Sequence, residues 1–187
     1  MTSLIAEDLL WLLHDDDTGR ALLARPVIDR LLAGAILLEA TGPDPDHLGV
    51  ETSCVALPRE FHTGRGLRES LLCRLVDAGK VRRARVRRLG MFAVDAFPTA
   101  DARGKRRLRT AVRRALLDSL RVDRHTEALI VLLSTIRATD AYCAGWSPEL
   151  VERAARAYEY RYISTAAAEH VKRAVCIAQA GIYTGAA

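Results

Sequence analysis

The sequence predicts a mainly α-helical fold, a single-domain helical bundle with a few short strands and a β-hairpin. Half of the residues are hydrophobic but only 5% are aromatic, so Leu, Val, Ile and Ala form most of the core, and this composition favours helices. Apolar residues also recur at three- and four-residue intervals in several segments, as they do on one face of a helix. A length of 187 residues suits one domain, so we expect residues 1–187 to form a single unit.

Two helices are expected before residue 41. Ser3 is the predicted N-cap of a helix that runs to about His14, and Pro26 is the predicted first residue of a second helix that ends near Ala40. Residues 15–19, Asp-Asp-Asp-Thr-Gly, are expected to form a turn between them. The last three match the tripeptide of aspartic proteases, but a helix stands where that chemistry needs an apolar strand. After a loop, residues 50–57 are predicted to form a short strand.

The stretch 64–88 combines a helix, a glycine stop and a basic strand. Its apolar residues recur at helical spacing, and Arg65 and Arg68 fall in the first turn of the helix. Free N–H groups and the helix dipole favour an anion at that position. Gly79 is the predicted left-handed cap at the end of the helix, and residues 81–94 are expected to form a hairpin. Its apolar stretch 89–92 either packs in the core or enters a bilayer beside the arginines.

Four further helices are expected in the second half of the chain. Asp101 is the predicted cap of a long helix over 102–120, and Asp123 caps the next, whose residues 128–133 are apolar on nearly every side. Ser147 followed by Pro148 predicts another helix start, and an alanine-rich helix over 165–181 is expected to end the fold.

Positive charge is concentrated in one part of the chain. Residues 80–114 contain thirteen Lys or Arg and two acidic residues, whereas the remainder carries more acidic than basic residues. Such a segment points to an anionic partner, which could be a membrane surface, nucleic acid or an acidic protein.

No recognised catalytic or metal-binding pattern occurs. The five histidines do not have metal-ligand spacing, the four cysteines include no CxxC pair, and the sequence has no phosphate-binding glycine loop and no GxSxG. We therefore expect a protein that is not an enzyme, with no catalytic residues, no metal and no cofactor. The cysteines are predicted to be buried, reduced thiols. The N-terminus has acids within its apolar stretch and no leading Lys or Arg, so it is a poor signal peptide and we expect a cytoplasmic protein.

Two alternatives use the charged segments differently. The order helix, basic hairpin, basic helix is typical of winged-helix DNA-binding proteins, but the exposed polar residues expected on that first helix, Arg68, Glu69, Arg74 and Asp77, are half acidic. The other alternative is a scaffold that binds basic peptide tails of membrane proteins through an acidic patch around Glu7, Asp8 and residues 15–17.

Several segments resemble the Golgi phosphoprotein 3 family, which has bacterial members that are common in actinomycetes. These segments are LIAEDLL at 4–10, DDTGR at 16–20, LAGAILLE at 32–39, LRESLLCRLVDAGKV at 67–81 and EALIVLL at 127–133. The resemblance implies a mostly helical single domain that binds phosphatidylinositol 4-phosphate at a membrane surface. It also implies an adaptor that links the membrane to the cytosolic tails of other membrane proteins.

The resemblance also implies site residues. Arg65 and Arg68 occupy two headgroup-binding arginine positions, whereas Ala24 and Ala33 stand where the family has a tryptophan and a further arginine. Arg25 and Arg30 lie nearby as candidate replacements. The family's membrane-dipping hairpin corresponds to about residues 89–92, and the residues expected to face the membrane are Leu89, Met91, Phe92, Arg85, Arg87 and Arg88.

The sequence therefore predicts a non-catalytic adaptor at the inner face of the membrane, with anionic phospholipid as its partner. Nucleic-acid binding through residues 80–114 and peptide-tail binding remain the alternatives, and a homo-oligomer is compatible with either.

Overall fold

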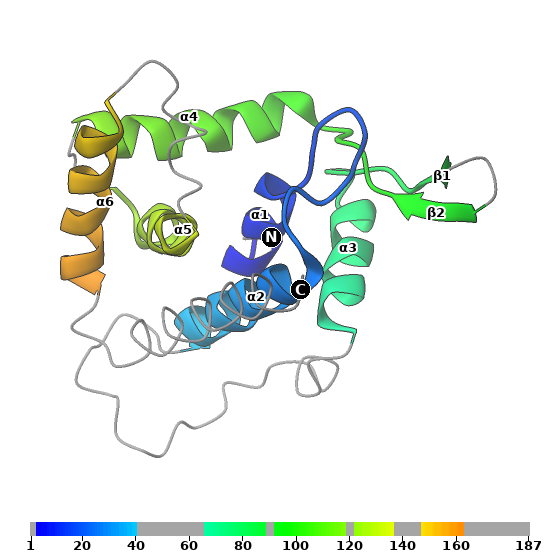
Figure 1. Cartoon of the computed structure of the whole chain (residues 1–187), viewed down its shortest axis with the longest axis horizontal. Helices are drawn as coiled ribbons and strands as arrows, with labels where there is room; N and C mark the ends of the chain where they lie inside the picture. The colour runs from blue at the N-terminus through cyan, green and yellow to red at the C-terminus, as the bar shows by residue number, and fades with distance from the viewer. Residues whose placement is uncertain (1–2, 41–65, 89–91, 119–121, 137–146, 163–187) are drawn as a thin grey trace, which may run out of the picture.

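The computed structural model describes residues 3–40, 66–88, 92–118, 122–136 and 147–162, which form six helices and one antiparallel hairpin (Figure 1). The mainly α-helical prediction is therefore confirmed. The elements are α1 (Ile5–Leu12), α2 (Arg25–Ala40), α3 (Leu67–Asp77), β1 (Ala84–Arg88), β2 (Phe92–Ala96), α4 (Ala102–Asp118), α5 (Arg124–Thr135) and α6 (Pro148–Tyr162). The predicted strand at 50–57 and the predicted helix at 165–181 lie outside the described residues.

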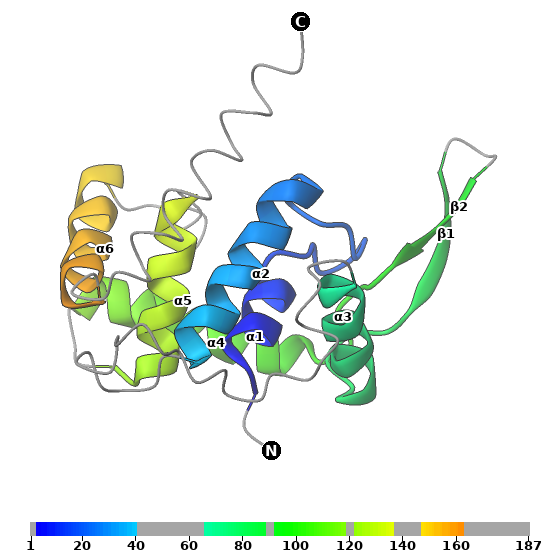
Figure 2. The ribbon, with the colours of Figure 1, turned by 90° about the horizontal axis from the view of Figure 1, so that it is seen from below.

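Helix α1 lies at the centre of the bundle and packs against α2, α3, α4 and α5 (Figures 1 and 2). All of its residues are buried, including the two acids Glu7 and Asp8. Residues 128–133 of α5 are also buried, as their apolar character predicts. The core therefore forms where α1 and α5 meet the apolar faces of the other helices.

The hairpin stands away from the helices (Figure 2). Arg85 lies opposite Asp95 and Val86 lies opposite Val94 in the register of β1 and β2. The base of the hairpin is attached to the body by backbone hydrogen bonds from Arg82 N to the Pro98 carbonyl and from Phe97 N to the Gly19 carbonyl. The hairpin predicted over 81–94 is therefore present, with its second strand two residues longer.

A cluster of charged residues fastens α1 to α3 and α5. Asp8 accepts hydrogen bonds from Lys80 Nζ at 2.7 Å, from His125 Nε2 at 3.0 Å and from the Ser3 hydroxyl at 2.9 Å. Glu7 pairs with Arg74 of α3. The predicted cap at Ser3 is therefore wrong, because the helix is capped at Leu4 and the Ser3 hydroxyl turns to the carboxylates. The acidic patch predicted around Glu7 and Asp8 is corrected as well, since both carboxylates are buried and paired.

A second ionic contact holds the α1–α2 loop against α4. Lys105 is 1% exposed, and its ammonium donates to the His14 carbonyl at 2.7 Å and pairs with Asp16 at 2.6 Å. Arg109, one turn further along α4, also pairs with Asp16, at 2.5 Å. The loop has the predicted turn, with Gly19 at φ +62°. These contacts fix the loop that borders the candidate site.

The starts of α4 and α5 have the predicted capping residues, whereas α2 begins at Arg25, one residue before the predicted first residue Pro26. Asp101 accepts from Gly104 N at 2.8 Å, and Asp123 accepts from Thr126 N at 3.0 Å and from the Thr126 hydroxyl at 2.8 Å. Gly79 ends α3 with φ +68°, as the left-handed cap requires.

We expect Asp123→Ala to lower the free energy of unfolding by about 1 kcal/mol, because the first turn of α5 loses the acceptor of its Thr126 N–H. Asp123→Asn keeps a side-chain acceptor and should lie close to wild type. Urea denaturation of the three proteins measures the difference. Equal stabilities for the alanine variant and wild type would contradict the role of this cap.

Candidate functional site

The start of α3 places Arg68 at the candidate site. Gly66 adopts φ +94° before the helix begins at Leu67, so Arg68 lies in the first turn, where the helix dipole favours negative charge. The Arg68 side chain is only 20% exposed and pairs with Glu69 at 3.1 Å. Its Nε atom is buried and has no hydrogen-bond partner among the described residues. Arg65 lies outside the described residues.

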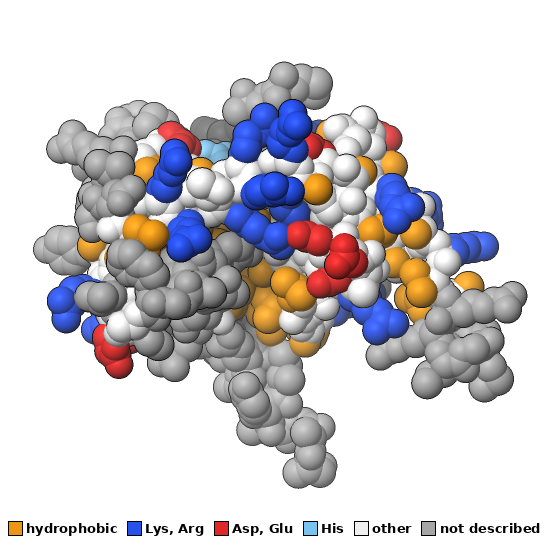
Figure 3. Space-filling view, turned by 90° about the horizontal axis from the view of Figure 1, so that it is seen from above, with side chains coloured by type: hydrophobic (Ala, Val, Ile, Leu, Met, Phe, Trp, Pro, Cys, Tyr) orange, Lys and Arg blue, Asp and Glu red, His pale blue; other side chains and the backbone are white. Residues whose placement is uncertain are grey.

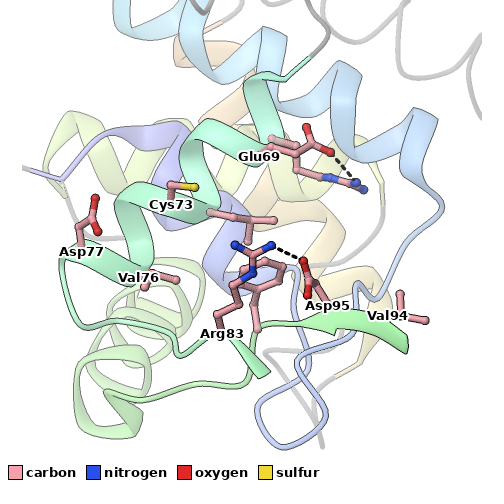
Figure 4. Close-up of a pocket in the computed structure, with 10 residues that line it drawn as sticks. Glu69, Cys73, Val76, Asp77, Arg83, Val94 and Asp95 are labelled. Carbon is pink, nitrogen blue, oxygen red and sulfur yellow. Dashed lines mark hydrogen bonds and ion pairs between the residues drawn. The ribbon is translucent and has the colours of Figure 1, made fainter. Parts of the chain in front are cut away.

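Two cavities meet at Arg68. The first, of about 360 Å³, lies between α3 and the base of the hairpin (Figure 4). Its apolar wall consists of Leu72, Val76, Val94 and Phe97. The second, of about 410 Å³, lies on the side of the α1–α2 loop and includes Gly19, Arg20 and Ala21. Each cavity therefore offers an apolar surface beside a partly buried guanidinium.

Charged residues line the first cavity on two sides (Figure 4). Glu69 lies beside Arg68 at one end, and the Arg83–Asp95 pair, at 2.5 Å, lies at the other. The hydrogen bond from Arg83 lowers the pKa of Asp95. Burial acts to raise the pKa of Glu69, but its hydrogen bonds with its own backbone N–H and with Arg68 hold it below its usual value. Glu69 and Asp95 are therefore ionised at neutral pH. Arg68 is paired with Glu69 and Arg83 with Asp95.

Arg25 and Arg68 are brought together through Glu69. Arg25, at the start of α2, is exposed and contacts Glu69 at 3.2 Å and Asp29 at 3.6 Å. Arg30 is exposed on α2 and is not among the described residues that line either cavity. Of the four arginines predicted for the headgroup, the structure thus gathers Arg25 and Arg68 on one carboxylate.

Cys73 also lies in the first cavity and is exposed, so its predicted burial is wrong. The residue falls on the solvent side of α3, whereas Leu71, Leu72 and Leu75 point into the core. The other three cysteines lie outside the described residues.

The hairpin carries an apolar pair that sequence reasoning missed. Val86 and Val94 are 40% and 45% exposed and lie opposite each other. The strand alternation of Val86 between two arginines was the available signal. Of the residues predicted to face the membrane, Arg85 is exposed and lies 3.9 Å from Asp95. Arg87, Arg88 and Phe92 lie on the strands. Leu89 and Met91 lie outside the described residues.

The exposed side of α3 is unfavourable for reading DNA. It presents Glu69, Cys73 and Asp77, and Arg74 is held by Glu7. Within the described residues, no group of three or more His, Cys, Asp or Glu side chains could hold a metal ion. A helix long and apolar enough to cross a membrane is likewise not found in the described part of the chain.

Comparison with known proteins identifies the family. Among curated proteins, none matches this chain. Residues 51–177, more than half of the chain, match the family described as Golgi phosphoprotein 3 (GPP34). The match includes α3, the hairpin, α4, α5 and α6, and therefore Arg65 and Arg68, whereas α1 and α2 precede it. The chain belongs to the Golgi phosphoprotein 3 (GPP34) family.

Proposed function

We propose that this protein is a cytoplasmic, peripheral membrane adaptor that binds the phosphate of an anionic phospholipid headgroup at Arg68. The observation that carries the proposal is the position of the Arg68 guanidinium, which lies where two cavities meet and has a buried Nε without a partner among the described residues. Family membership supports an adaptor of lipid and protein. Charge-assisted hydrogen bonds from arginine to phosphate are strong and frequently bidentate.

Binding requires Arg68 to exchange Glu69 for the phosphate. Glu69 also contacts Arg25 at 3.2 Å, so it keeps a cationic partner after the exchange. The start of α3 adds the favourable end of the helix dipole. Arg65, three residues earlier in the chain, is the second headgroup arginine in this proposal.

The hairpin provides the second contact with the membrane. Val86 and Val94 form an exposed apolar pair, and the exposed Arg85 precedes Val86 in the sequence. In this proposal Leu89, Met91 and Phe92 enter the interface, and Arg85, Arg87 and Arg88 contact lipid phosphates. Each arginine near an anionic surface contributes about 1 kcal/mol, so attachment should be reversible and sensitive to salt.

Vesicle co-sedimentation tests the proposal. We expect vesicles that contain phosphatidylinositol phosphates or cardiolipin to bind the wild-type protein, and Arg68→Ala to weaken binding about tenfold, because a charged hydrogen bond is lost. Arg153→Ala, at an exposed position of α6, removes the same charge elsewhere and should bind as wild type does. Thermal unfolding of both variants verifies that the fold is retained.

Two results would refute the proposal. One is equal sedimentation with anionic and with neutral phosphatidylcholine vesicles at low salt. The other is an Arg68→Ala variant that folds and still binds anionic vesicles as tightly as wild type.

A further inference from the structure

We infer that the exposed face of α4 is a docking surface for an acidic peptide segment of a partner protein. The face carries arginines that are all exposed, and none of them has an acidic partner among the described residues. They are Arg103, Arg106, Arg107, Arg113 and Arg114. Figure 3 views the molecule from the α4 side and shows basic side chains gathered there.

These arginines form a continuous stripe. Arg103, Arg107 and Arg114 follow one another at four and seven residues, so they lie on one side of the helix. With Arg106 they line a shallow groove of about 320 Å³, in which Thr110 and Ala111 are the small residues. At about 1.5 Å of rise per residue the stripe is about 16 Å long, which matches about five residues of an extended chain at about 3.3 Å each.

The described part of the fold does not use these charges. Lys105 and Arg109 of the same helix hold Asp16, and the opposite side of α4 buries Val112 and Leu116 in the core. Like charges at three- and four-residue spacing destabilise a helix. Repulsion within the stripe therefore remains uncompensated among the described residues, and a carboxylate-rich partner would relieve it.

The surroundings of the stripe favour a narrow peptide over a nucleic acid. The basic face follows a single helix. It is bordered by the acidic loop 15–17, in which Asp16 pairs with Lys105 of α4 and Asp17 is exposed. This acidic border opposes a broad polyanion such as duplex DNA. Single-stranded nucleic acid depends on aromatic side chains for stacking, and the described side chains of α4 include none.

A lipid bilayer fits the stripe less well than a peptide does. The described exposed side chains of α4 are arginine, threonine and alanine, so none of them is a large apolar group that could enter the interface. In Figure 1, α4 runs along the top of the bundle and the hairpin strands extend to the right, so the two surfaces face different directions. Carboxylates of a peptide can pair with guanidinium groups in bidentate geometry along the groove.

Fluorescence anisotropy with a labelled peptide of about six Asp and Glu residues tests the inference. We expect saturable binding that weakens about fivefold or more in Arg107→Ala/Arg114→Ala, because two charge-paired contacts are lost. The matched control, Arg153→Ala/Arg156→Ala, removes two exposed arginines from α6 and should bind as wild type does. Arg68→Ala should also leave peptide binding unchanged, which separates this surface from the proposed lipid site.

Four results would overturn the inference. The peptide could fail to bind, or the α6 control could lose as much affinity as the α4 variant. Duplex DNA, or vesicles containing phosphatidylserine, could bind more tightly than the peptide and lose that binding in the α4 variant. The first two would show that the stripe is only a solvated charged face, and the last two would assign it to nucleic acid or to the membrane.

Discussion

Replacing Gly19 with alanine is expected to lower the free energy of unfolding by about 2–4 kcal/mol, through backbone strain and overpacking together. Gly19 has φ +62°, and a Cβ atom at this position would lie 2.1 Å from Pro98 N and 2.3 Å from the Phe97 carbonyl carbon. These neighbours are backbone atoms, so no side-chain rotation can relieve the contact. The Gly19 carbonyl also accepts the Phe97 N–H at 3.1 Å, which attaches the end of β2 to the loop.

The matched control is Gly79→Ala. Gly79 has a similar φ of +68°, but an added Cβ would meet no atom of the described residues within 4 Å. Only the backbone strain then remains, about 1–2 kcal/mol. Urea denaturation of the two variants and wild type measures the difference. If both variants lost the same stability, the close approach between the loop and residues 97–98 would have no energetic consequence.

Replacing Asp8 with asparagine is expected to lower the free energy of unfolding by about 3 kcal/mol, because it leaves Lys80 and His125 beside a neutral side chain in a mostly buried site. The Asp8 residue is 8% exposed. An exposed ion pair is the control: Glu69→Gln removes a carboxylate that is 51% exposed and should cost less than about 1 kcal/mol. Denaturation curves that shift equally for the two variants would contradict the role of the buried cluster.

The Asp8→Asn variant should also change how the free energy of unfolding depends on pH. The hydrogen bond with Asp8 raises the pKa of His125, so the stabilisation is fully present below the unfolded pKa of about 6.5 and is lost as pH rises through the folded value. Burial acts to raise the pKa of Asp8, but the hydrogen bonds from His125 and Lys80 hold it below its usual value. The Asp8 contribution is therefore lost only as pH falls through that lowered pKa.

The titration of His14 also changes stability with pH, so the effect of His125 must be measured as a difference between two proteins. Burial lowers the pKa of His14, so its contribution is lost as pH falls and opposes that of His125. Wild type and Asp8→Asn both contain His14, so its contribution cancels in the difference between their free energies of unfolding. We expect that difference to shrink between about pH 6 and pH 8. A constant difference over that range would show that His125 does not titrate against Asp8.

The local features of the fold were predictable from the sequence because they depend on neighbouring residues. A cap at Asp101 or Asp123 needs only the residues that follow it, and the stop at Gly79 needs only the freedom of glycine to adopt positive φ. The burial of 128–133 follows from their apolar character.

The pairing of buried charges was not predictable. Glu7 and Asp8 read as a solvent-exposed patch because their partners, Arg74, Lys80 and His125, are more than sixty residues away in the chain. Only the packing of α1 between α3 and α5 brings these groups within hydrogen-bond distance. The Ser3 error has the same origin, since its hydroxyl turned to those carboxylates.

Part of the candidate site was predictable and part was not. Arg68 was identified from its place in the first turn of α3. The cavity beside it requires the base of the hairpin to lie next to α3, which no local pattern encodes, so Val94, Asp95 and Phe97 were not expected as lining residues. The contact of Arg25 with Glu69 likewise depends on the packing of α2 against α3.

The buried ion pairs of α1 have a consequence for the order in which the protein folds during synthesis. The partners of Glu7 and Asp8 lie at residues 74, 80 and 125. Asp16 pairs with the buried Lys105. When α1 and α2 leave the ribosome, none of these partners has yet emerged. Desolvating a carboxylate without its partner is costly, so α1 cannot be buried in its final position at that stage. The central helix of the finished bundle is therefore the first to be synthesised and among the last to be fixed.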